Sequence, residues 1–149
     1  MSTGVQTREL PDVTDTESLG ESLAHDLSAG DLVILDGPLG AGKTALARGI
    51  ARGLGVVGRV SSPTFIIARE HRPGGDGRPG MVHVDAYRLG GLEELDALDL
   101  DTDLADAVVV VEWGEGVAER LADRHLLVRL TRDPDTDVRH AEWGWVNHQ

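Results

Sequence analysis

The feature that most constrains the fold is an apolar stretch that runs into a glycine-rich loop and then into a helical pattern. The stretch "LVIL" (32–35) is typical of a short buried strand, and the loop "GPLGAGKT" (37–44) follows it almost at once. From Lys43 to Leu54 apolar residues recur at helical spacing, and Gly55 is typical of a helix end. A strand, a tight glycine loop and a helix in this order are typical of the α/β class, in which helices cover a mainly parallel sheet.

The same loop matches the pattern G-x-x-x-x-G-K-[ST], in the strand-to-helix setting that gives the pattern its meaning. Its glycines allow backbone N–H groups to wrap closely round a phosphate group, and the helix N-terminus adds its dipole. We expect Lys43 to supply charge to the β- and γ-phosphates of a nucleotide, in binding and in catalysis, and Thr44 to offer a hydroxyl to Mg²⁺. The predicted nucleotide-binding residues of this segment are Gly37, Leu39, Gly40, Ala41, Gly42, Lys43, Thr44 and Ala45.

The rest of the chain continues the alternation of helical and apolar segments. Residues 1–13 are predicted to be a loose or strand-like lead-in, and Thr14 with Glu17 fits a capping box that starts a helix ending near residues 28–30. Further strands are predicted at 64–68, 81–84, 108–111, 125–130 and 138–146, and further helices at 92–98 and 116–122. We therefore predict a single domain over residues 1–149, with a three-layer α/β fold like that of P-loop NTPases. Its central sheet should be mainly parallel, with antiparallel strands near 64–84 and at the C-terminus.

The charge balance argues against direct binding of nucleic acid or of anionic membranes. The chain carries 26 acidic and 14 basic residues, and its formal net charge is −12. Such a surface repels phosphate backbones and anionic headgroups. There is no cysteine, hence no disulfide framework and no thiol chemistry, and no apolar run approaches membrane length. We expect a soluble, cytoplasmic protein.

Two predicted strands end in a carboxylate, which is what the Mg²⁺ side of a nucleotide site requires. "MVHV" (81–84) is followed by Asp85, and the four valines at 108–111 are followed by Glu112. Parallel strands bring their C-terminal ends to one edge of the sheet, where the phosphate loop also lies. We assign Glu112 to the metal, because its strand is the more continuously apolar and so the more central, and Asp85 to the γ-phosphate or the attacking water. The two residues could exchange these roles, and His83 is expected to be packed or hydrogen-bonded.

The chain resembles the bacterial TsaE (YjeE) family, through four motifs that occur in the order and spacing of that family. The motifs are "GPLGAGKT" (37–44), "SPTF" (62–65), "HVDAYRL" (83–89) and "VEWGE" (111–115), and the resemblance runs from residue 10 to about residue 140. It implies a small P-loop ATPase needed for threonylcarbamoylation of adenosine 37 in tRNA. It also implies ATP and Mg²⁺ as cofactors.

The resemblance also implies roles for individual residues. Lys43 and Thr44 would bind phosphate and Mg²⁺, and Glu112 would be the second protein ligand of the metal, in agreement with the assignment above. Asp85 would take part in hydrolysis. Thr16 and Arg139 would lie near the nucleotide, and Trp113 would respond to it.

The partners implied by the resemblance are the proteins of the TsaB–TsaD complex, with tRNA engaged only indirectly and docking that depends on nucleotide. We expect the protein alone to hydrolyse ATP slowly, because apart from the family match at Arg139 the residues themselves place no arginine near the predicted phosphates. Arg48 and Arg52 follow Thr44 along the helix, away from its phosphate-binding end. Docking on the partners should then raise the rate.

Other functions remain open on the sequence. A GTPase would need an Asn-Lys-x-Asp motif and an ABC-type ATPase a Leu-Ser-Gly-Gly signature, and both are absent. A free-standing small-molecule kinase shares the loop and the size of this chain. A nucleotide-binding regulator without turnover would keep Lys43 and Thr44 but would need neither Asp85 nor Glu112.

Overall fold

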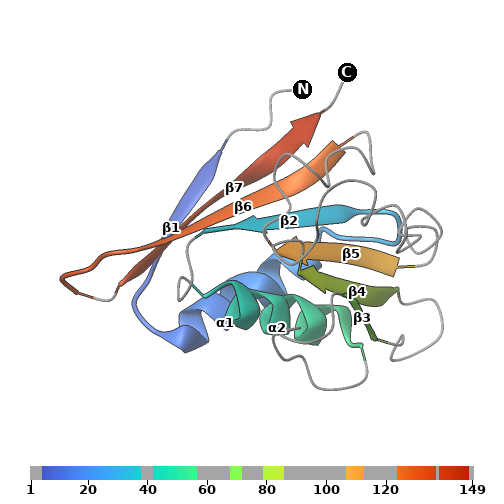
Figure 1. Cartoon of the computed structure of the whole chain (residues 1–149), viewed down its shortest axis with the longest axis horizontal. Helices are drawn as coiled ribbons and strands as arrows, with labels where there is room; N and C mark the ends of the chain where they lie inside the picture. Colours follow the sequence, from blue (N-terminus) through green and yellow to red (C-terminus); the bar gives the residue numbers. More distant parts are fainter. Residues whose placement is uncertain are drawn as a thin grey trace.

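The structure is a computed structural model that describes residues 5–37, 42–56, 68–71, 79–85, 107–112, 124–136 and 138–147. For residues 68–71, 85 and 147 it describes the backbone. Two helices and seven strands lie within these ranges (Figure 1). In chain order they are β1 (Gln6–Leu10), α1 (Val13–Ala24), β2 (Leu32–Asp36), α2 (Lys43–Leu54), β3 (Ala68–His71), β4 (Gly80–Asp85), β5 (Ala107–Glu112), β6 (Arg124–Arg132) and β7 (Arg139–Asn147).

The seven strands form one sheet in the order β1-β7-β6-β2-β5-β4-β3. The four central strands are parallel to one another, because β2 pairs in parallel with both β5 and β6, and β4 pairs in parallel with β5. The outer strands are antiparallel, with β3 against β4 at one side and β6, β7 and β1 at the other. This confirms the predicted α/β fold, with parallel strands in the middle and antiparallel strands near 64–84 and at the C-terminus.

The centre of the sheet follows from where the sequence is most apolar. Every residue of β5 is buried, and the four valines from Val108 to Val111 have no exposed surface. In β2 the residues from Leu32 to Leu35 have none either. Strands that are buried on both faces read as unbroken apolar runs. Burial of a valine or leucine side chain contributes about 1.5–3 kcal/mol to the stability of the folded state, so these two strands form the centre of the core.

Helices α1 and α2 pack side by side on one face of the sheet (Figure 1). Three glycines at their interface allow the two backbones to approach closely, since a Cβ on Gly49 would lie 2.0 Å from the Glu17 carbonyl oxygen and one on Gly20 would lie 2.4 Å from the Leu46 carbonyl oxygen. The third is Gly53. Packing this close leaves room only for a hydrogen atom at these positions. It brings the first turn of α1 to the first turn of α2.

Ion pairs at the edge of the same interface fix how the two helices are aligned. Arg48 Nε donates to Glu17 Oε2 at 3.0 Å, and Arg52 Nη1 donates to Glu21 Oε1 at 2.9 Å. The hydrogen bond from Arg48 lowers the pKa of the Glu17 carboxyl below 4.5, and the nearby charges of Arg48 and Arg52 act in the same direction. Both arginines therefore point across to α1 and not toward the start of α2, as expected.

The predicted elements within the described residues are confirmed, with corrections to the first helix and to the strand predicted at 64–68, since β3 runs from Ala68 to His71. The Thr14–Glu17 capping box is wrong: Asp12 is the N-cap, its backbone N–H donates to Asp15 Oδ2 at 3.0 Å, and Glu17 pairs with α2 instead. The helix ends at Ala24, short of residues 28–30, and the chain continues in turns. The predicted helices at 92–98 and 116–122, which would supply the third layer, lie outside the described residues, as does the predicted strand at 64–68 apart from Ala68. Neither α1 nor α2, the two helices of the described ranges, is long and apolar enough to cross a membrane.

Candidate functional site

The described residues on either side of the predicted phosphate loop, Gly37 and Gly42, have backbone conformations that favour glycine. Gly42 is the N-cap of α2, and its φ of 105° lies in the left-handed region that glycine tolerates without strain. Gly37, which follows β2, has a φ of 149°. As a glycine, Gly42 offers no side chain to cap α2, so the N–H groups of the first turn point out of the helix end without a bond from the N-cap residue. An anion placed there would meet these donors and the positive end of the helix dipole.

Lys43 is the first residue of α2, and its side chain reaches back to Gly37, the residue that follows β2. Its Nζ atom donates a hydrogen bond to the carbonyl oxygen of Gly37, which links the two ends of the loop. The residue is only 5% exposed. A buried ammonium group is stabilised by anionic or hydrogen-bonding partners, and its position at the helix N-terminus favours a phosphate group. Thr44, the next residue, is half-buried on the first turn of the same helix.

Two residues from other elements converge on Gly42. A Cβ on Gly42 would lie 3.3 Å from Arg139 Cδ and 3.5 Å from Thr16 Cγ2. Thr16 comes from α1, whose close packing on α2 places it there, and Arg139 is the first residue of β7. Thr16 has no exposed surface, and its hydroxyl oxygen finds no hydrogen-bond partner among the described residues. The structure therefore brings both family-implied residues to the start of α2, and gives one of them a buried hydroxyl that a ligand could satisfy.

The predicted carboxylates lie at the edge of the sheet where the loop begins. In the strand register Glu112 of β5 is opposite Leu35 of β2 on one side and Asp85 of β4 on the other. All three strands run in parallel, so their C-terminal ends meet at this edge, as expected. Glu112 is 5% exposed, and Asp85 is described in its backbone only.

The partner of Glu112 within the described residues is His83, which the sequence did not identify. His83 Nε2 lies 2.6 Å from Glu112 Oε2, and His83 is fully buried. The expected partner of the carboxylate was a metal ion alone. One signal in the sequence could have found the histidine: His83 and Asp85 are two residues apart and so face the same side of β4. If Asp85 and Glu112 are opposite each other, His83 must lie on the face that carries Glu112.

The oxygen donors at this edge fit Mg²⁺. A carboxylate from Glu112 and a hydroxyl from Thr44 are the hard ligands that Mg²⁺ prefers, and the ion commonly takes only one or two protein ligands, with water and phosphate oxygens filling the rest. A site made entirely of protein ligands is not seen, since the described residues contain no group of three histidines, cysteines or carboxylates placed to hold a metal. Four predicted site residues lie outside the described residues: Leu39, Gly40, Ala41 and Trp113.

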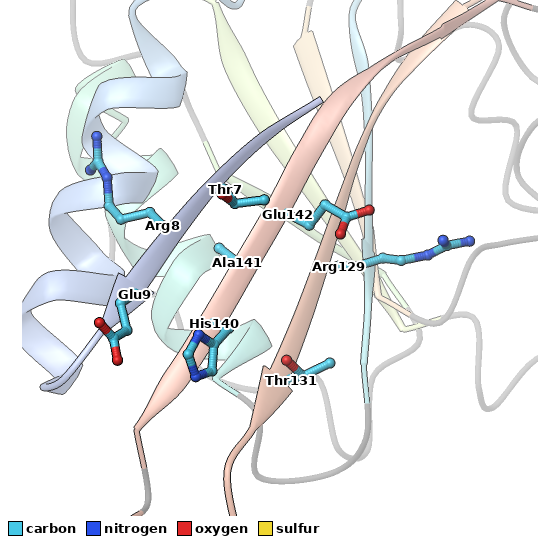
Figure 2. Close-up of a pocket in the computed structure, with 8 residues that line it drawn as sticks. All are labelled: Thr7, Arg8, Glu9, Arg129, Thr131, His140, Ala141 and Glu142. Carbon is cyan, nitrogen blue, oxygen red and sulfur yellow. The ribbon is translucent and has the colours of Figure 1, made fainter. Parts of the chain in front are cut away.

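A second hollow, of about 620 Å³, lies elsewhere on the sheet and is distinct from this site. Figure 2 shows its lining on β1, β7 and β6, including Glu9, Thr131 and His140. Side chains alternate between the faces of a strand, so His140 faces away from the side on which the side chain of its neighbour Arg139 lies beside Gly42. None of the residues that line the hollow belongs to the predicted set.

Comparison with known proteins identifies relatives along almost the whole chain. The sequence model of the family described as "Threonylcarbamoyl adenosine biosynthesis protein TsaE" matches residues 10–141. A protein of Mycobacterium bovis named tRNA threonylcarbamoyladenosine biosynthesis protein TsaE is 60% identical, over 96% of this chain and 89% of that protein. Proteins with the same name from Streptomyces coelicolor and Bacillus subtilis are 59% and 35% identical, over 83% of this chain in each case and 85% and 75% of those proteins.

A solved structure shows the same architecture. The crystal structure of Bacillus subtilis YdiB superposes with a TM-score of 0.74 at 28% sequence identity, and the match covers 97% of this chain and 87% of that one. The similarity therefore extends well beyond the loop at 37–44, which many unrelated proteins share.

Proposed function

The chain belongs to the TsaE family, whose members are named for threonylcarbamoyladenosine biosynthesis in tRNA, and we propose that it acts there as a Mg²⁺-dependent ATPase. One observation carries this proposal: a buried lysine at the open start of α2, with Thr16 and Arg139 against the same glycine and Glu112 at the end of the neighbouring strand. Backbone donors, a fixed positive charge and a strand-end carboxylate are the parts that phosphoryl transfer requires.

Each residue of the site has a distinct task in this proposal. Lys43 and the N–H groups of the first turn of α2 bind the β- and γ-phosphates and stabilise the charge that develops on them. Thr44 and Glu112 hold Mg²⁺, which when bound neutralises charge between these phosphates. Asp85 orients the attacking water or accepts its proton. Thr16 and Arg139 contact the nucleotide, and Trp113, next to Glu112, responds to it.

The role in the cell follows from the family and from the charge of the chain. We propose that the protein docks on the TsaB–TsaD complex in the cytoplasm in a nucleotide-dependent way, and that tRNA is held mainly by those partners. A net charge of −12 disfavours direct contact with RNA and is compatible with docking on protein. ATP hydrolysis would then reset the complex between rounds of transfer.

The first test is direct binding of ATP. Removing the ammonium group in Lys43→Ala should weaken binding of Mg²⁺–ATP at least about tenfold, a change of about 1.4 kcal/mol, because the buried charge that faces the phosphates is lost. Isothermal calorimetry measures the affinity, and Arg52→Ala is the matched control, since that cation lies on the same helix but pairs with Glu21. Equal affinity of Lys43→Ala and wild type would refute the proposed site.

A further inference from the structure

The carboxylate that we assign to Mg²⁺ is already held by a histidine on the neighbouring strand. His83 is fully buried, Glu112 is 5% exposed, and 2.6 Å separates His83 Nε2 from Glu112 Oε2. A carboxylate that binds a metal ion can only accept hydrogen bonds, so in the metal-binding form Nε2 would be the donor, and the other ring nitrogen, Nδ1, has no hydrogen-bond partner among the described residues. A hydrogen bond to a charged acceptor is among the stronger ones in proteins, and burial strengthens it further.

The surroundings of this pair restrict where the carboxylate can turn. In the strand register Asp85 is opposite Glu112 and His83 is opposite Val110, so the histidine approaches from the interior side of the strand end. The residues that precede the strand ends, from Met81 to Val84 in β4 and from Val108 to Val111 in β5, are all buried. The hydrogen bond with His83 therefore engages Glu112 Oε2, and we assign the other oxygen, Oε1, to a ligand at the edge of the sheet.

We propose that His83 is a positioning residue for the metal site: it holds Glu112 Oε2 so that the carboxylate coordinates Mg²⁺ through one oxygen, Oε1. The inference rests on the proposed function, which makes Glu112 a ligand. Its physical basis is general, because hydrogen bonds to a metal ligand fix the orientation of that ligand, and loss of such a partner typically costs about 10–100-fold in metal affinity.

The test compares two substitutions of His83 by the Mg²⁺ dependence of ATP binding. In His83→Leu the side chain stays large and apolar but the donor is lost, so the Mg²⁺ concentration for half-maximal ATP binding should rise about 10–100-fold. In His83→Gln the amide nitrogen can reach the position of Nε2 and donate, so most of the shift should be reversed. Binding of ATP measured in excess chelator should change less than about twofold in both.

A control variant separates positioning from general damage to the strand. Met81 is also fully buried and lies on the same face of β4, two residues before His83, and it has no hydrogen bond to Glu112. Met81→Ala should lower the urea concentration at the unfolding midpoint, because it leaves a cavity in the core, and should leave the Mg²⁺ midpoint within about twofold of wild type. A Mg²⁺ midpoint that moves equally in Met81→Ala and His83→Leu would overturn the proposal, because His83 would then act only through stability.

The remaining outcomes are distinct from failure of the proposed function. If Glu112→Gln shifts the Mg²⁺ midpoint and His83→Leu does not, the metal ligand stands and the positioning role is overturned. If Glu112→Gln itself has no effect, the proposed metal site fails. If His83→Leu does not fold, His83→Asn replaces it, since the shorter amide does not reach Glu112. A midpoint in His83→Asn equal to that in His83→Gln would then overturn the proposal.

Discussion

At the scale of single residues, the site is made by side chains whose burial is explained by a partner. Lys43 bonds Gly37 across the loop, and Glu112 is paired with His83. Two buried atoms of the site have no hydrogen-bond partner among the described residues, the hydroxyl oxygen of Thr16 and Nδ1 of His83, and the Thr16 hydroxyl lies at the start of α2. Buried polar groups are nearly always hydrogen-bonded in folded proteins, so this hydroxyl is a candidate contact for a bound nucleotide.

Substitutions should distinguish the roles of the two carboxylates at the strand ends, Glu112 and Asp85. We predict that Glu112→Gln raises the Mg²⁺ concentration needed for ATP binding, because it removes a charged ligand. We predict that Asp85→Asn leaves binding within about threefold of wild type and lowers turnover at least about 100-fold, because it removes a base or water-orienting group. Titrations with ATP at several Mg²⁺ concentrations, and single-turnover hydrolysis, measure the two effects. If Asp85→Asn is the variant that loses Mg²⁺ dependence, the roles are reversed.

At the scale of elements, the sequence predicted what depends on local chemistry. Helix α2 has the predicted bounds, Lys43 to Leu54, because Gly42 and Gly55 both adopt left-handed conformations at its ends. The predicted start of α1 is wrong because two possible capping boxes, Asp12 with Asp15 and Thr14 with Glu17, overlap in the sequence. Asp12 with Asp15 forms the cap, and Glu17 is drawn to Arg48 of α2, a tertiary contact that no local pattern reveals.

Two features of the site could not be predicted for the same reason. The bond between His83 and Glu112 depends on the register of β4 against β5, which are separated in the sequence by residues 86–106. The position of Arg139 beside Gly42 depends on the non-sequential order of the strands, which places β7 between β1 and β6. The family resemblance implied that Arg139 lies near the nucleotide, but only the order of strands in the sheet shows how it reaches the start of α2.

The close packing of α1 on α2 gives a prediction about stability. Gly49→Ala would place a methyl group 2.0 Å from the Glu17 carbonyl oxygen, so the helices must separate. We expect a loss of about 1–3 kcal/mol in the free energy of unfolding, despite the better helix propensity of alanine. Urea denaturation measures it. Ser22→Ala, on the exposed face of α1, is the control and should stay within about 0.5 kcal/mol of wild type. An unchanged Gly49→Ala midpoint would contradict the observed approach of the helices.

The ion pair between the helices gives a prediction about pH. Arg48 lowers the pKa of Glu17 below its ordinary value of 4.5, so the folded state favours the ionised carboxyl. This contribution to stability is present above pH 4.5 and is lost as the pH falls through the lowered pKa. The difference in stability between wild type and Glu17→Gln should therefore shrink as the pH falls below 4.5, as measured by urea denaturation. A difference that grows at low pH would contradict the pairing.

At the scale of the whole molecule, the sheet gathers the site from distant parts of the chain. Parallel strands β2, β4 and β5 end at one edge, and α1 and β7 bring Thr16 and Arg139 to the start of α2. This corrects one premise of the rate expectation, because an arginine does lie beside the loop. We still predict slow hydrolysis by the protein alone, with completion of the site by docking. Arg139→Ala tests the alternative, since an arginine finger supplied by the chain itself would be worth about 10³–10⁵ in rate.

The most direct measurement is phosphate release by the purified protein, alone and then with its matching TsaB and TsaD. We predict turnover far below about 1 s⁻¹ for the protein alone and a clear rise when both partners are added. Lys43→Ala should abolish the rise, because it removes the charge at the phosphates, while Arg52→Ala should retain it. Fast turnover by the protein alone, with no stimulation by the partners, would contradict a partner-coupled ATPase and favour a free-standing kinase or ATPase. An absence of turnover in every mixture, with ATP binding intact, would instead identify a nucleotide-binding regulator.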